Sequence, residues 1–338
     1  MAPPANSQFP AQPSAQSSAQ SQRSAAPSSE RLPRQGFFLL ASLALFWGTN
    51  WPAMKLAVQD MDPWTFRAIC FIAGAGGLML VARARGLSLR IPRSDLGPLI
   101  VTALINVTCW QIFSAFGLTL MAAGRASIIA FTMPLWASIL SVVFLRERMT
   151  VLRVVGLALG LAALAILLIP EFGRMGGTPW GAAMMLAAAI SWAVGTVMLK
   201  AIPWRMDTIQ LAAWQLAIGG VPVILAALLI GDPASVTNLT TPGAIGVVYA
   251  ALIQMIYCHW AWFRIVSLFP ANVAAIGTLA IPVVGVFSSA LILGEPLAGA
   301  DLLALSLVVA GLFIVLVLPS LLPQRPKART ADPVSSRR

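Results

Sequence analysis

Polar side chains inside long apolar runs are the residues of this sequence most able to do chemistry. Gln111 and His259 lie 148 residues apart in two such runs, beside the aromatic residues Trp110, Tyr257 and Trp260. A polar group in hydrocarbon is costly, so we expect these side chains to face the protein interior. There they could hydrogen-bond a small molecule whose apolar parts the rings cover. Interhelical hydrogen bonds, with the rings filling space, are the alternative.

The stretch from Gly48 to Pro52 is a further candidate. Pro52 cannot donate a backbone N–H, so it disturbs a helix around residue 48. An amide such as Asn50 needs a partner in mid-bilayer, and we expect it to face a cavity or to act in gating. A local kink satisfied by Thr49 is the alternative. The predicted binding site therefore comprises Asn50, Trp110, Gln111, Tyr257, His259 and Trp260.

Two further prolines, Pro134 and Pro282, are also 148 residues apart. Matched prolines predict two matched helix kinks, which together with Pro52 could serve as hinges. Static kinks that only improve packing remain the alternative.

Charged residues avoid the middle of the apolar runs. Lys55, Arg67 and Arg125 fall near the run ends, where they would either snorkel to lipid headgroups or anchor an anionic substrate. Asp62 and Asp207 are predicted helix N-caps. With no carboxylate at mid-run, His259 is the only candidate for titration near neutral pH, and the sequence leaves proton coupling open.

The composition explains why these runs must cross a membrane. The 338 residues are 59% hydrophobic and only 10% charged, against about 25% charged in ordinary soluble domains. This excludes a soluble enzyme and a disordered chain. The net charge of +11 is not evidence for nucleic-acid binding, because the basic residues fall in the loops. The three cysteines lie in apolar runs, which argues against a disulfide framework.

Breaks in the apolar pattern define ten spans of about 20 residues each. Residues 1–35 and 320–338 lack the apolar side chains that a fold needs, and are predicted to be disordered tails. The spans are predicted at 37–58, 64–82, 97–120, 124–144, 151–169, 180–201, 208–230, 243–263, 271–293 and 300–318.

The basic residues also predict an orientation. If the loops alternate sides, 18 Lys and Arg fall on the side of the N-terminus and 4 on the other. Cytoplasmic loops carry the excess of basic residues, so both termini are expected in the cytoplasm.

The two halves of the chain repeat each other. Trp47 and Lys55 recur as Trp192 and Lys200 at an offset of 145, and Glu147 recurs as Glu295 at 148. The repeats are predicted at 36–170 and 178–319. Each holds five spans, an odd number, so the second must enter the membrane from the opposite side. The predicted fold is an all-α integral membrane protein with ten transmembrane helices in two inverted five-helix repeats.

The segment from Phe46 to Lys55 resembles the first helix of the EamA family of the drug/metabolite transporter superfamily. Arg67, Pro134 and the Leu145-Arg-Glu147 ending fit the same pattern, and Pro282 and Leu293-Gly-Glu295 repeat it. The resemblance covers residues 36–319. It implies a ten-helix inner-membrane carrier of small metabolites, often an exporter of amino acids or related compounds.

The leading functional prediction is therefore a secondary transporter in the cell (inner) membrane, with a small molecule and the lipid bilayer as partners. The sequence lacks the Gly-x-x-x-x-Gly-Lys-Ser/Thr fingerprint of nucleotide binding, and we expect no cofactor, no metal and no nucleic acid. A channel and, less favoured, an intramembrane enzyme are the alternatives; we expect no enzyme activity. Gly156 and Gly160 permit close helix contact, for which packing within the chain is favoured and a homodimer is left open.

Overall fold

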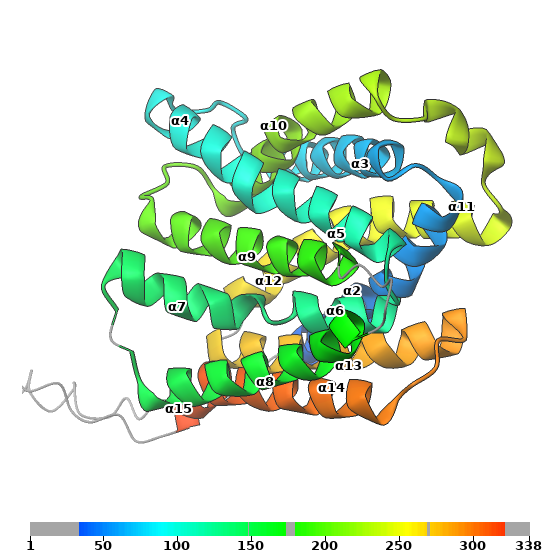
Figure 1. The fold of residues 1–338 in the computed structure, drawn as a ribbon. Helices are drawn as coiled ribbons and strands as arrows, with labels where there is room; N and C mark the ends of the chain where they lie inside the picture. The colour runs from blue at the N-terminus through cyan, green and yellow to red at the C-terminus, as the bar shows by residue number, and fades with distance from the viewer. Residues whose placement is uncertain (1–33, 148, 174–179, 269–270, 322–338) are drawn as a thin grey trace, which may run out of the picture.

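A computed structural model describes residues 34–147, 149–173, 180–268 and 271–321 (Figure 1). Within these ranges the secondary structure is helical and contains no strand. The predicted disordered tails fall almost entirely outside the described residues. The fold class is as predicted, because long apolar segments can satisfy their backbone groups in a bilayer only as helices or closed barrels.

The first repeat contains five spans, two of which are divided into shorter helices. Its elements are α2 (Arg34–Asp60), α3 (Pro63–Ala84), α4 (Arg93–Thr102), η1 (Ala103–Cys109), α5 (Trp110–Thr119), α6 (Ala123–Ala130), α7 (Met133–Leu145) and α8 (Val151–Gly173). The third span consists of α4, the π-helical η1 and α5, and the fourth of α6 and α7.

The second repeat follows the same order. Its elements are α9 (Trp180–Ala201), α10 (Thr208–Leu229), the short 3₁₀ helix η2 (Pro233–Asn238), α11 (Thr241–Val248), the π-helical η3 (Tyr249–Cys258), α12 (His259–Leu268), α13 (Ala271–Leu293), α14 (Gly299–Leu312), η4 (Phe313–Val317) and α15 (Leu318–Leu321). Here α11, η3 and α12 together form the eighth span.

The described part of the chain has nine helical segments long and apolar enough to cross a membrane, and Thr278–Leu293 of α13 is a shorter apolar stretch. These segments match the ten predicted spans. The predicted N-caps are confirmed: Asp62 accepts a hydrogen bond from the backbone N–H of Thr65, at 2.9 Å, and Asp207 accepts one from Ile209, at 2.9 Å.

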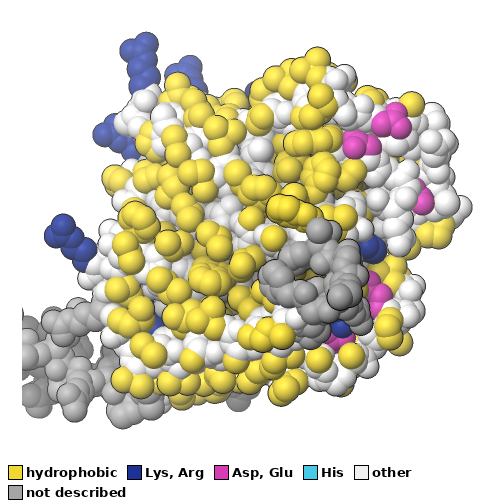
Figure 2. All heavy atoms as spheres, in the orientation of Figure 1, with side chains coloured by type: hydrophobic (Ala, Val, Ile, Leu, Met, Phe, Trp, Pro, Cys, Tyr) yellow, Lys and Arg dark blue, Asp and Glu magenta, His cyan; other side chains and the backbone are white. Residues whose placement is uncertain are grey.

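The two ends of the helical bundle differ in charge, and we call them the acidic end and the basic end. The acidic end carries Asp60, Asp62, Asp232, Glu295 and Asp301. The basic end carries Arg83, Arg85, Arg93, Arg146, Arg153, Lys200 and Arg205. Figure 2 shows extended Lys and Arg side chains at one end, Asp and Glu together with some basic atoms at the other, and a largely hydrophobic surface between them. Helix α2 ends at the acidic end and its repeat equivalent α9 at the basic end, so the repeats are inverted.

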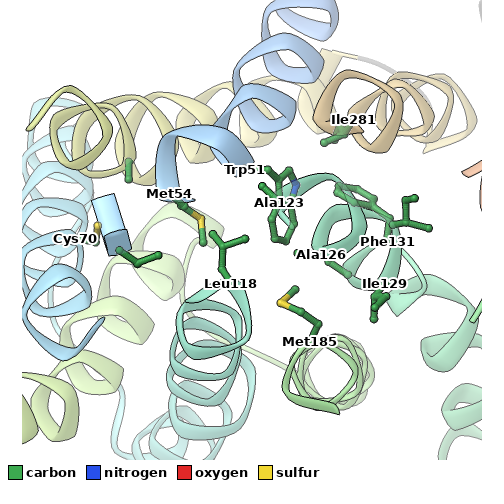
Figure 3. Close-up of a cluster of buried hydrophobic side chains, with 14 of the residues drawn as sticks. Trp51, Met54, Cys70, Leu118, Ala123, Ala126, Ile129, Phe131, Met185 and Ile281 are labelled. Atoms are coloured by element: carbon green, nitrogen blue, oxygen red, sulfur yellow. The ribbon is translucent and has the colours of Figure 1, made fainter. Parts of the chain in front are cut away.

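Helices of the two repeats pack against each other through the whole bundle. Helix α2 packs on α13, α3 on α10, α5 on α9 and α8 on α14. At the centre, side chains from five helices meet in one buried cluster that includes Trp51, Leu118, Ala126, Met185 and Ile281 (Figure 3). In this way the fold brings spans 1 and 6 against spans of the opposite repeat.

Glycines allow several of these helices to approach closely. A methyl group added at Gly156 would lie 3.0 Å from the carbonyl oxygen of Gly311, and one at Gly160 would lie 2.0 Å from Leu135. Both glycines therefore pack within the chain, as the sequence favoured.

Candidate functional site

Arg67 lies at the centre of a buried polar cluster. Its side chain is only 1% exposed. Its Nε donates to the backbone oxygen of Gln111 at 2.8 Å, its Nη2 donates to Ser114 Oγ at 2.9 Å, and its guanidinium lies 5.0 Å from the ring centre of Phe66. The snorkelling predicted for Arg67 is therefore wrong, because the side chain turns inward and ties α3 to α5.

Two of the predicted site residues belong to this cluster. Asn50 donates from Nδ2 to Met54 Sδ at 2.9 Å, and Arg67 Nη2 lies 3.7 Å from the same sulfur. Gln111 donates from Nε2 to Met255 Sδ at 3.3 Å. We call Asn50, Met54, Arg67, Gln111 and Ser114 the Arg67 cluster. Among the described residues, no carboxylate lies within salt-bridge distance of Arg67.

His259 lies in a separate group of aromatic side chains. Its Nδ1 is 3.0 Å from the backbone oxygen of Gln254, and its ring meets that of Trp47 edge to face at 6.2 Å. A carbonyl oxygen can only accept, so Nδ1 carries the hydrogen and the neutral ring leaves Nε2 as an acceptor. The ring of Trp262 also lies near that of Trp47, with the ring centres 6.0 Å apart. Gln111 and His259 thus have different neighbours, although they occupy equivalent positions.

The remaining aromatic site residues contact other parts of the bundle. Tyr257 shares a hydrogen bond with the Ser42 hydroxyl at 2.7 Å, and its ring lies 5.8 Å from Trp260. Both rings pack on the first half of α2, around Leu40 and Leu43. Trp110 instead packs against Trp192 of α9, at 5.1 Å. The six predicted residues therefore lie on spans 1, 3 and 8, with Trp110 contacting span 6, and they do not form a single cluster.

The π-helical segments η1 and η3 are structural features that the sequence analysis missed. They occupy equivalent places in the two repeats, and each carries an amide side chain, Asn106 and Gln254. The side-chain oxygens of both amides are buried with no hydrogen-bond partner, as is Asn50 Oδ1. Buried polar atoms are nearly always paired, and π-helical turns recur at functional sites. These three buried oxygens therefore lack a protein partner in this structure.

Lys55 and Arg125 are engaged with protein groups at the acidic end. Lys55 Nζ donates to the backbone oxygens of Leu118 and Met121, at 2.6 and 2.9 Å. Arg125 Nε forms a salt bridge with Asp301 Oδ1 at 2.8 Å. Both side chains thus have partners within the protein, and whether they also reach lipid headgroups or a substrate stays a prediction.

The three predicted hinge prolines lie in different local structures. Pro52 is inside the unbroken α2, and Pro282 is inside the unbroken α13. Pro134 instead stands in the first turn of α7, just after the break that separates α6 from α7. The helix break beside Pro134 has no counterpart at Pro282, and the matched kinks and the hinge role stay predictions.

Comparison with known proteins agrees with the arrangement of two repeats. The sequence model of the EamA-like transporter family matches residues 34–169 and again 179–317. The uncharacterized transporter YvbV of Bacillus subtilis (strain 168) is 32% identical over 278 residues, which cover 82% of this chain and 90% of YvbV. The uncharacterized inner membrane transporter YedA of Escherichia coli (strain K12) is 27% identical over 298 residues, covering 86% of this chain and 93% of YedA.

A relative with a more specific name and one solved structure extend the comparison. A protein of Salmonella typhimurium, described as a probable amino-acid metabolite efflux pump, is 25% identical over 304 residues and covers 84% of this chain and 95% of its own length. One crystal structure matches with a TM-score of 0.60 at 22% identity, over 83% of this chain and 96% of that one, and shows the fold alone. Both repeats and nearly all the helical bundle fit one family of multi-pass membrane transporters, and the chain belongs to the EamA-like transporter family.

Proposed function

We propose that this transporter is a secondary carrier that exports small metabolites, amino acids or related compounds, across the cytoplasmic membrane by alternating access. The observation that carries the proposal is the pair of inverted repeats, in which α2 and α9 run in opposite directions and pack on helices of the other repeat. Carriers of this construction bind substrate between the repeats and expose it to each side in turn.

The substrate region is proposed between spans 1, 3, 6 and 8. The unpaired oxygens of Asn50, Asn106 and Gln254 supply acceptors there, and the half-buried rings of Trp47 and Trp192 supply apolar surface. Acceptors of this kind suit the ammonium group or amide of an amino-acid-like compound. His259, Gln111, Trp110, Tyr257 and Trp260 remain predicted members of the site or of its supporting shell.

The class of substrate and the direction of transport rest on similarity. The Salmonella relative is described as a probable amino-acid metabolite efflux pump, and its match spans most of both chains. The orientation rests on charge: the basic end is proposed to face the cytoplasm, since cytoplasmic loops carry the Lys and Arg excess. Both termini are then cytoplasmic.

Counterflow in vesicles tests the proposal. Purified protein in liposomes preloaded with a mixture of unlabelled amino acids should accumulate a trace of labelled amino acid transiently, and uptake should saturate with concentration. Protein-free liposomes are the control. Uptake that rises linearly with concentration and shows no counterflow would indicate a channel, and conversion of the label to a new compound would indicate an enzyme.

A further inference from the structure

The segments around Glu147 and Glu295 are structurally equivalent and lie at opposite ends of the molecule. Helices α7 and α13 each end two residues before the glutamate. The intervening residue is left-handed in both, with φ of 54° at Arg146 and 67° at Gly294. A residue other than glycine rarely adopts this conformation, so the shared turn indicates a shared role.

At the acidic end, Glu295 binds the beginning of a helix in the other repeat. Its Oε1 accepts from the backbone N–H of Ala123 at 2.6 Å and its Oε2 from Gly124 at 2.9 Å. A carboxylate is favoured there, because the first N–H groups of α6 have no partner within the helix. Close by, Lys55 binds the carbonyl oxygens at the end of α5. We call these the acidic-end contacts.

At the basic end, the equivalent residues make different contacts. Lys200, the repeat equivalent of Lys55, donates to Glu147 Oε1 at 2.5 Å, and Arg153 Nη2 donates to Glu147 Oε2 at 2.6 Å. The glutamate and the lysine that bind helix ends at the acidic end are thus paired with each other at the basic end. Equivalent residues of the two repeats therefore make different contacts at the two ends of the molecule.

The fourth and ninth spans differ in the same way. The fourth is broken between α6 and α7, next to Pro134, whereas the ninth is the single helix α13 across Pro282. Equivalent segments with unequal shapes are what two repeats adopt when one end of a carrier is closed and the other is open.

We propose that these contacts exchange between the ends during alternating access, an inference that rests on the proposed carrier function. In the opposite state Glu147 accepts from the backbone N–H groups of Ala271 and Asn272, the equivalents of Ala123 and Gly124, and Lys200 binds the end of α12. Glu295 then releases α6 and pairs with Lys55.

Cross-linking the full chain in liposomes tests the exchange. One variant carries Glu295→Cys with Gly124→Cys, and the other carries Glu147→Cys with Asn272→Cys. A third cysteine, Ser127→Cys, reports opening of the acidic end, because Ser127 is fully buried between α6 and α13. An impermeant thiol reagent labels it, and mass spectrometry of its peptide gives the rate.

Bridging positions 295 and 124 should leave the cysteine at 127 unreactive. Bridging positions 147 and 272 should raise its labelling rate by about 10- to 1,000-fold, because a state populated at roughly 0.1–10% becomes the main one. The proposal fails if the 147–272 bridge does not form, or if that bridge leaves labelling unchanged. No substrate is needed, so the result is independent of counterflow.

A second variant keeps both glutamates and most of the fold. Arg153→Gln removes a partner that Glu147 has in the present state and is expected to lose in the other. Labelling at position 127 should rise about 1.5- to 5-fold, as the loss of one exposed ion pair predicts. Arg90→Gln, which removes the same charge from the same end, is the matched control. Equal labelling in the two variants would overturn the exchange.

Discussion

Gly195 in α9 tests the contact between the repeats at the proposed substrate region. An alanine methyl group there would lie 2.2 Å from both Cβ and Oδ1 of Asn106, well inside van der Waals contact. Asn106 is only 5% exposed and has little room to withdraw. Overpacking of this kind costs about 1–3 kcal/mol. Against it stands the helix propensity of alanine, about 1 kcal/mol more favourable than that of glycine.

A matched glycine separates the two effects. Gly76 in α3 is exposed and has no atom within 4 Å of an added methyl group, so Gly76→Ala changes helix propensity alone. The difference in free energy of unfolding between Gly195→Ala and Gly76→Ala should then be about 1–3 kcal/mol. Thermal unfolding of both purified variants in one detergent should show Gly195→Ala melting lower by about 1–5 °C.

Two results decide the matter. Adding Asn106→Gly to Gly195→Ala should recover part of the lost stability, since it removes the atoms in conflict. Equal melting temperatures for Gly195→Ala and Gly76→Ala would refute the packing described between α9 and η1, and with it the assignment of Asn106 to the region between the repeats.

The remaining predictions concern the site, the prolines and the basic end. Gln111→Ala and His259→Ala should each weaken substrate affinity about 2- to 30-fold, whereas Gln210→Ala at the basic end should not; wild-type affinity in both would place the site elsewhere. His259→Gln should flatten the dependence of transport on pH, if the neutral ring must accept a hydrogen bond. Pro134→Ala and Pro282→Ala should each lower the transport rate with little change in substrate affinity. Wild-type transport rates in both variants would make the prolines packing features only. Hydrogen bonds from Lys200 and Arg153 lower the pKa of the Glu147 carboxyl. Its contribution to stability is therefore complete above the unfolded value, about 4.3, and is lost as pH falls through the folded value. The stability difference between wild type and Glu147→Gln should be small, because the side chain is 26% exposed, and should vanish in acid; a constant difference from pH 7 to pH 3 would contradict it.

The spans and caps could be predicted because their causes are local. A run of about 20 apolar residues fixes a span, and Asp62 and Asp207 cap the helices that follow them through bonds to residues two or three positions later. The inverted repeat followed from counting, since five spans reverse the direction of the chain.

The interior contacts could not be predicted, because they depend on which helices meet. Arg67 stands near a span end in the sequence, and only the packing of α3 on α5 shows that its partners are the Gln111 carbonyl and Ser114. The π-helical segments η1 and η3 have no composition of their own. Their sole sequence signal is the pair Asn106 and Gln254, which recur 148 residues apart.

Pro134 and Pro282 show a different limit of prediction from the sequence. The sequence places them at equivalent positions and predicts equal kinks, yet only the first lies beside a helix break. Two repeats with equivalent prolines can adopt different local structures, and the repeat pattern alone does not reveal which of the two helices is broken.

The opposite insertion of the two repeats is the claim on which the whole account depends, and thiol labelling tests it most directly. Ser88→Cys places a reporter in the loop at residues 83–93, and Thr237→Cys places one in the loop at 231–242; both residues are exposed. In intact cells an impermeant reagent should label position 237 from outside, and position 88 only after the membrane is opened. Labelling of both positions from the same side would contradict the inverted repeats and the carrier mechanism built on them.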